Sequence, residues 1–148
     1  LEIMRDSRIG TYGAAALALS ILLRWTALHD LATVPNVLAG LVAAHAASRG
    51  LIAAFMHMLP SARTNGLAAD AGAPAADTAI AGAALGVLAL LMLGLPGALL
   101  AALLLGLWFV LFQKLCLAQI GGHTGDTIGA LQQGGEILVL LVASVILI

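Results

Sequence analysis

Three short polar segments interrupt an otherwise apolar chain of 148 residues, and they hold most of the side chains that could do chemistry. The segments are residues 4–13 (MRDSRIGTYG), 59–67 (LPSARTNGL) and 121–130 (GGHTGDTIGA). Carboxylates can bind Mg²⁺, guanidinium groups can clamp phosphate through two hydrogen bonds, and glycines let a ligand approach the backbone closely. This combination of residue types favours phosphoryl or nucleotidyl transfer.

The first segment places a carboxylate between two arginines. We expect Asp6 and Arg8 to be catalytic, Asp6 to be a Mg²⁺ ligand, and Gly10 and Gly13 to belong to the phosphate-binding site. The same spacing also fits a charged cap at the start of a membrane helix, and the residues alone do not decide between these two interpretations.

The other two segments offer a guanidinium and a glycine-rich turn. Arg63 either binds phosphate or anchors a helix end at the cytoplasmic surface. The glycine-rich turn before a helix can present N–H groups to an anion, although the Gly-Lys-Ser/Thr of a P-loop is missing. We expect Thr124 and Gly125 to bind phosphate and Asp126 to be catalytic, sharing a metal with Asp6. Alternatively, Thr124 or Asp126 only caps the following helix.

Ionisable residues also lie inside the apolar stretches. His45 and Arg49 are four residues apart and therefore share one helical face. Because charged groups inside a membrane usually face the bundle interior or a wet cavity, we expect His45 to bind substrate and Arg49 to be catalytic. The alternative is a structural arginine paired between helices. We expect the Arg24 side chain to snorkel towards the membrane surface. Glu136 is interpreted as a charge at the start of a helix.

Composition indicates an integral membrane protein. The chain is 62% hydrophobic and 9% charged, with a mean hydropathy of +1.11, whereas soluble domains carry about 25% charged residues. Six Lys and Arg residues and a net charge of -1 argue against nucleic acid as a partner. The lone Cys116 is expected to fill the core.

Five membrane-spanning helices are predicted in an all-α polytopic bundle that forms one membrane domain over residues 1–148. A tight hairpin is expected around the Gly94–Pro96 turn, and the last helix is either truncated or begins earlier, near Thr127. The predicted spans are 11–28, 36–59, 78–95, 96–118 and 136–148.

The number of spans places all three polar segments on one side of the bilayer. Two spans separate the first segment from the second, and two more separate the second from the third, so the chain returns to the same face each time. Arg5, Arg8, Arg63 and Lys114 lie near that face, which the positive-inside rule identifies as cytoplasmic. One shared active site is therefore expected.

The runs LEIMRDSRIGTYGAAALAL, LPSARTNGL and GGHTGDTIGALQQGGEI, together with His45 to Arg49, resemble the cobalamin synthase family. This resemblance covers essentially the whole chain. It implies a ribazoletransferase of the bacterial inner membrane that requires Mg²⁺. Its substrates would be adenosylcobinamide-GDP and α-ribazole or its 5′-phosphate, and its products adenosylcobalamin or its 5′-phosphate and GMP.

One part of the family pattern is absent. An acidic stretch of the form His-x-Asp-Gly-Leu-x-Asp-x-x-Asp is expected shortly before the first polar segment, and it does not occur in the sequence. The resemblance therefore implies a fragment that lacks the N-terminal part of the family and is inactive alone. The expected partners are the substrates, the lipid bilayer and, as an open alternative, further copies of the chain. The competing hypothesis is a membrane transporter or permease subunit that uses His45 and Arg49.

Overall fold

The computed structural model describes residues 10–147, and its long elements are all α-helices. Within this range the only β-type pairing is a single parallel bridge between Ser61 and His123. The prediction of an all-α bundle is confirmed. The helices are α1 (Thr11–Asp30), α2 (Val34–Met58), α3 (Leu67–Asp70), α4 (Ala76–Leu90), α5 (Gly94–Ile120) and α6 (Gly125–Ile146).

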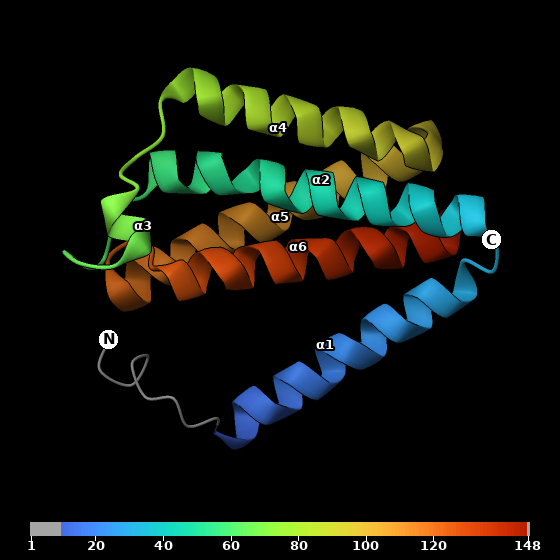
Figure 1. Ribbon diagram of the computed structural model, residues 1–148, viewed down its shortest axis with the longest axis horizontal. Coiled ribbons are helices and arrows are strands. Elements are labelled where there is room, and N and C mark those ends of the chain that lie inside the picture. Colours follow the sequence, from blue (N-terminus) through green and yellow to red (C-terminus); the bar gives the residue numbers. More distant parts are fainter. Residues whose placement is uncertain (1–9, 148) are drawn as a thin grey trace.

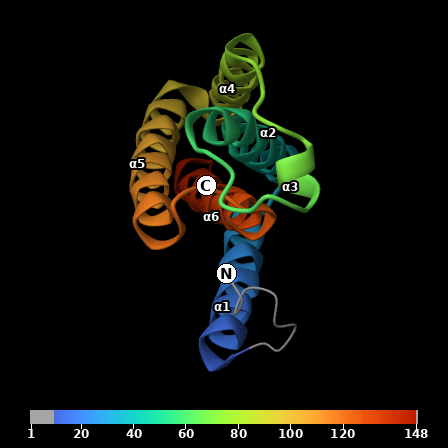
Figure 2. The ribbon, with the colours of Figure 1, turned by 90° about the vertical axis from the view of Figure 1, so that its left-hand side faces the viewer.

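Helix α6 lies at the centre of the bundle and contacts α1, α2 and α5 (Figures 1 and 2). Helix α4 packs against the outer side of α2, away from α6 (Figure 2). Helix α1 begins apart from the bundle and approaches it towards its C-terminal end (Figure 1), and Ala27 is its one buried residue. The core therefore lies between α2, α5 and α6.

The helix boundaries follow from local backbone chemistry. Thr33 caps α2, and Pro35 occupies the first turn, where a missing N–H costs no hydrogen bond. Between α4 and α5 the chain forms the 3₁₀ turn η2 (Leu91–Leu93), and Gly94 follows with φ +71°, a conformation that glycine adopts without strain. The two helices are antiparallel (Figure 1), so the predicted hairpin is confirmed.

Four helical stretches in the described residues are long and apolar enough to cross a membrane: Thr11–Asp30, Val34–Met58, Ala76–Ile120 and Gly125–Ile146. The 45-residue stretch folds back at η2 and so provides both helices predicted over 78–95 and 96–118. The protein is accordingly a multi-pass membrane protein. The boundary predicted at Glu136 was wrong, because α6 begins at Gly125, and the earlier start near Thr127 was the better prediction.

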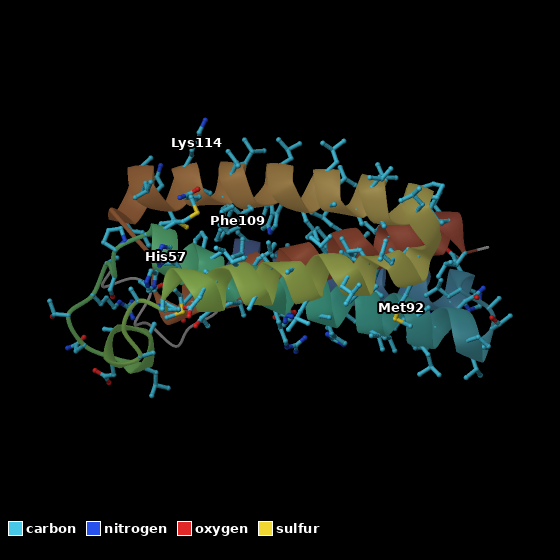
Figure 3. All side chains as sticks on the ribbon, turned by 90° about the horizontal axis from the view of Figure 1, so that it is seen from above. His57, Met92, Phe109 and Lys114 are labelled. Carbon is cyan, nitrogen blue, oxygen red and sulfur yellow. The ribbon has the colours of Figure 1, made fainter. Side chains whose placement is uncertain are left out.

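Large apolar side chains cover the outside of the helices, as lipid contact requires. On α5, Leu99, Leu103 and Leu107 are all more than half exposed. Figure 3 shows Phe109 on the inner side of the same helix and Lys114 pointing away from the bundle. The inner aromatic side chains pack around Phe55 beneath the polar loops, and the buried Cys116 belongs to that cluster.

Candidate functional site

The second and third polar segments lie side by side because their backbones are hydrogen-bonded. The Ala62 N–H donates to the His123 carbonyl at 2.8 Å, and the His123 N–H donates to the Pro60 carbonyl at 2.9 Å. Both segments occupy the end of the bundle where α2 ends and α6 begins (Figure 1). The prediction that these two segments share one face is confirmed. The first segment lies outside the described residues except for its last four positions.

The start of α6 is held by a capping box. The Thr124 hydroxyl accepts a hydrogen bond from the Thr127 N–H at 3.3 Å, and the Thr127 hydroxyl accepts one from the Thr124 N–H at 2.8 Å. Thr124 is therefore the cap, and it is 2% exposed. This leaves the Asp126 carboxylate in the first turn free of any capping role, and 61% of the side chain is exposed.

A small cavity of about 160 Å³ lies where the loops meet. Arg63 borders it from the second polar segment and Asp126 from the first turn of α6, and their Nη2 and Oδ2 atoms are 4.0 Å apart. The start of α6 adds the positive end of its helix dipole. The cavity therefore combines a guanidinium, a carboxylate and a helix N-terminus. It is lined by Ser61, Arg63, Asn65, Gly66, Leu67, Ala68, Ala69, Thr124, Gly125 and Asp126.

Other predicted members of this site are not among those lining residues. Gly10 precedes α1 in an extended conformation, and Gly13 lies in the exposed first turn of that helix. Asp6 and Arg8 lie outside the described residues. The described residues contain no group of three His, Cys, Asp or Glu side chains that could hold a metal ion. They do offer the Asp126 carboxylate, which suits Mg²⁺, an ion that commonly binds one or two carboxylates and keeps several waters.

His123 forms the inner wall of the paired loops. It is 3% exposed, its ring lies 6.4 Å from that of Phe55, and its Nδ1 has no hydrogen-bond partner among the described residues. Burial lowers the pKa of the His123 imidazole from its ordinary value, because desolvation disfavours the charged ring. Its packing and its backbone hydrogen bonds give it a structural role beneath the cavity.

A second polar cluster lies inside the membrane-spanning part and centres on Glu136. The carboxylate accepts hydrogen bonds from Arg24 Nε at 3.0 Å and Gln132 Nε2 at 2.6 Å. His45 Nδ1 lies 3.0 Å and Arg49 Nη1 4.0 Å from Glu136 Oε2. The residue is 6% exposed. Charged groups at this depth require partners, and helices α1, α2 and α6 supply them.

This cluster corrects two predictions. Glu136 is not a charge at a helix start, because α6 begins at Gly125 and Glu136 is buried in its middle. Arg24 does not snorkel, since it also donates to the Ser20 hydroxyl at 2.6 Å and pairs with Glu136. Sequence reasoning therefore missed both residues. The sequence did hold a signal for Glu136. If the last helix begins at the glycine-rich turn, Glu136 becomes a lone carboxylate inside an apolar helix.

The shared face of His45 and Arg49 is confirmed, because both side chains approach Glu136. Arg49 Nη1 also lies 2.8 Å from His45 Nδ1. These residues do not join Arg63 and Asp126 in one site. Glu136 lies ten residues beyond Asp126 on α6, which is about 15 Å at 1.5 Å per residue. The polar residues form two sites at different depths instead of the single site predicted.

Comparison with protein families gives a match over residues 1–144 to the model described as cobalamin-5-phosphate synthase. A curated relative from Mesorhizobium japonicum, named adenosylcobinamide-GDP ribazoletransferase, is 65% identical over 147 residues, which cover 99% of this chain and 57% of the relative. A relative of the same name from Bradyrhizobium diazoefficiens is 50% identical over 145 residues, covering 97% of this chain and 56% of its own length.

A third relative with this name, from Brucella ovis, is 42% identical over 155 residues. The chain thus spans somewhat more than half the length of the curated relatives it matches. No solved structure matches it.

Proposed function

This chain belongs to the cobalamin-5-phosphate synthase family, and we propose from that premise that it forms part of an adenosylcobinamide-GDP ribazoletransferase. The enzyme would transfer the adenosylcobinamide phosphate group to α-ribazole or its 5′-phosphate and release GMP. The observation that carries this proposal is the loop pairing that brings Arg63 within 4.0 Å of Asp126 at the N-terminus of α6.

The chemistry of the substrate suits that arrangement. A hydroxyl oxygen of the ribazole attacks the phosphorus next to cobinamide and loses its proton to solvent water, a new P–O bond forms, and the bond to the GMP phosphate breaks so that GMP leaves. Negative charge develops on the diphosphate oxygens, where a guanidinium and backbone N–H groups stabilise it. Arg63 and the first turn of α6 provide these groups at one cavity.

We assign Asp126 a Mg²⁺-binding role in this proposal. Mg²⁺ would supply charge neutralisation at the diphosphate, and an exposed carboxylate beside an arginine offers it one oxygen ligand. Asp6 is the second proposed ligand and Arg8 a further phosphate-binding group, both on the first polar segment. Gly10, Gly13, Thr124 and Gly125 would shape the backbone around the diphosphate.

The proposed location is the bacterial inner membrane, with the cavity at the cytoplasmic face. Arg63 and Lys114 lie towards the end of the bundle that carries the cavity, in agreement with the positive-inside rule. A water-soluble nucleoside and a GDP-activated substrate would reach the cavity from that side.

Exchange of Asp126 for Asn tests the proposal. In the intact protein in membranes, we expect Mg²⁺-dependent GMP release to fall about 100-fold in D126N, because charge stabilisation of a transition state is commonly worth that much. The matched control is D77N, which changes another exposed acid in the first turn of a helix, at a position that does not line the cavity. Equal turnover in D126N and D77N would contradict the assignment.

A further inference from the structure

Helix α1 is held to the bundle by few apolar contacts. Its first nine residues, 11–19, are all exposed, and Ser20 and Arg24 are the first positions of the helix that are partly buried. Ala27 is its one buried residue. Apolar burial gives little driving force between helices in lipid, so the exposed apolar side chains of α1 do not fix its direction. Polar contacts must do so.

Arg24 supplies polar contacts between α1 and α6. Its Nε donates to Glu136 Oε1 at 3.0 Å and its Nη2 to Gln133 Oε1 at 2.5 Å, while Nη1 donates to the Ser20 hydroxyl of its own helix at 2.6 Å. Only 19% of the Arg24 side chain and 8% of the Glu136 side chain are exposed. Charged groups this far from water keep their partners, because separation would leave each one desolvated and unpaired. The pair is therefore a fixed point between the two helices.

The two oxygens of the Glu136 carboxylate have different partners. Oε1 accepts from Arg24, whereas Oε2 accepts from Gln132 Nε2 at 2.6 Å and lies 3.0 Å from His45 Nδ1. Gln132 belongs to α6 and His45 to α2. The carboxylate is thus oriented by α2 and α6 together, and its Oε1 atom presents a fixed acceptor to α1.

The pair sets the place of α1 along α6. Arg24 lies 13 residues after the start of α1 at Thr11, and Glu136 lies 11 residues after the start of α6 at Gly125. At 1.5 Å per residue these separations are about 20 and 17 Å. Both helices run away from the end of the bundle that carries the cavity of the paired loops (Figure 1). The two helix starts therefore lie at similar distances from one shared point.

The direction of α1 then depends on its angle at that point. The helix diverges from α6 towards Thr11 (Figure 1). A rotation of about 10° about Arg24 would move Thr11 by about 3 Å, given the length of about 20 Å between them. Misplacement of a reacting or ligating group by about 1 Å is enough to slow a reaction strongly. The angle at Arg24 therefore matters for chemistry at the far end of α1.

We propose that Arg24 and Glu136 are positioning residues for the first polar segment. That segment runs directly into α1 in the sequence, so the angle that the pair gives α1 determines the direction from which the segment approaches the cavity of the paired loops. This inference rests on the proposed function, in which Asp6 is the second Mg²⁺ ligand. It adds that an ion pair inside the membrane controls Mg²⁺ binding at the end of the bundle.

Distances between spin labels on the intact protein in lipid nanodiscs test the first step. The labels are attached at L17C on α1 and G129C on α6, both exposed positions, and the buried Cys116 is exchanged for Ala. A Cβ at position 129 meets no atom within 4 Å, so the label does not disturb α6. We compare wild type with R24Q and E136Q, and with the control K114Q, which removes a positive charge from a side chain that points away from the bundle (Figure 3).

We expect the mean distance between the labels to shift by about 3 Å, or its distribution to widen by as much, in R24Q and E136Q, and to be unchanged in K114Q. The double variant R24Q/E136Q should shift no further than either single variant, because both substitutions remove the same contact. Wild-type distances in R24Q and E136Q would overturn the inference.

The Mg²⁺ dependence of GMP release tests the second step in the same variants without labels. We expect the Mg²⁺ concentration for half-maximal turnover to rise at least fivefold in R24Q and E136Q and to stay at the wild-type value in K114Q. A merely structural role would lower kcat through loss of folded protein and leave this concentration unchanged, and that result would also overturn the inference. Wild-type protein that releases no GMP would contradict the proposed function, whereas the label distances would still decide whether the pair sets the direction of α1.

Two milder variants serve if R24Q or E136Q does not fold. R24K and E136D keep both charges and change the length and shape of one side chain, so the ion pair can form only if α1 shifts. We expect changes in the same direction as in R24Q but smaller, with about a twofold rise in the Mg²⁺ concentration for half-maximal turnover. Wild-type distances and wild-type Mg²⁺ dependence in both R24K and E136D would overturn the inference.

Discussion

Gly122 occupies the point where the two paired loops approach most closely. A Cβ atom added there would lie 2.2 Å from the Pro60 carbonyl oxygen and 3.1 Å from its carbon. Both contacts are with backbone, which cannot rotate away as a side chain can. The loops can therefore form their two hydrogen bonds only with glycine at this position.

Exchange of Gly122 for Ala is accordingly expected to separate the loops. Loss of the bridge should destabilise the protein by about 2 kcal/mol and reduce turnover, as measured by the thermal midpoint in detergent and by GMP release. The control is G129A, a helical position where a Cβ meets no atom within 4 Å and where Ala is favoured over Gly. A G122A protein as stable as G129A would show that the loop pairing is not required.

The sequence indicated the members of the loop cavity better than those of the membrane cluster. Arg63 and Asp126 both line this cavity, and both belong to polar, glycine-containing segments that stand out in an apolar chain. The pairing of Glu136 with Arg24 could not be predicted, because the two residues lie on helices that are far apart in the sequence. A lone charge in an apolar helix does not reveal its partner until the packing of α1 against α6 is known.

At the scale of the elements, close packing between α2 and α4 depends on small residues. A Cβ at Gly50 would lie 2.4 Å from the Gly82 carbonyl oxygen, and one at Gly86 would lie 3.0 Å from the Ala47 Cα. Helices in lipid associate largely through such close contacts, since apolar burial offers little driving force there. Helix α4 has few other contacts, so this seam fixes its position.

Exchange of Gly50 for Ala should therefore loosen α4. We expect a destabilisation of about 1–3 kcal/mol from overpacking against backbone, together with faster hydrogen exchange in α4. The substitution G106A provides the comparison, because a Cβ at this position on α5 meets nothing within 4 Å. Similar melting and exchange for the two variants would mean that the glycine seam does not hold α4.

Most helix boundaries could be predicted because local rules govern them. Pro35 near the start of α2 and Gly94 before Pro96 break the chain where the structure breaks it. The start of α6 was harder, since Glu136 suggested a boundary while Thr124 actually caps the helix. Two local signals competed, and the capping box with its two hydrogen bonds determined the outcome.

At the scale of the whole molecule, the number of spans was the most useful prediction. An even number of crossings between the second and third polar segments brings them to one end of the bundle, and the structure confirms it. The number of crossings does not give the depth of a residue within the membrane. Arg49 and Glu136 belong to a separate cluster about 15 Å along α6 from Asp126, a separation that only the packed helices reveal.

We propose that the paired loops form a single phosphate site. A double-mutant cycle on Arg63 and Asp126 in the intact protein tests it most directly, with kcat/KM for GMP release measured in wild type, R63Q, D126N and the double variant. If both groups act on the same diphosphate, the fold-loss in kcat/KM of the double variant should be at least tenfold smaller than the product of the two single fold-losses. The reason is that residues that share a ligand are coupled. The pair K114Q and D126N provides the control. Independent, multiplicative losses for R63Q and D126N would contradict the account.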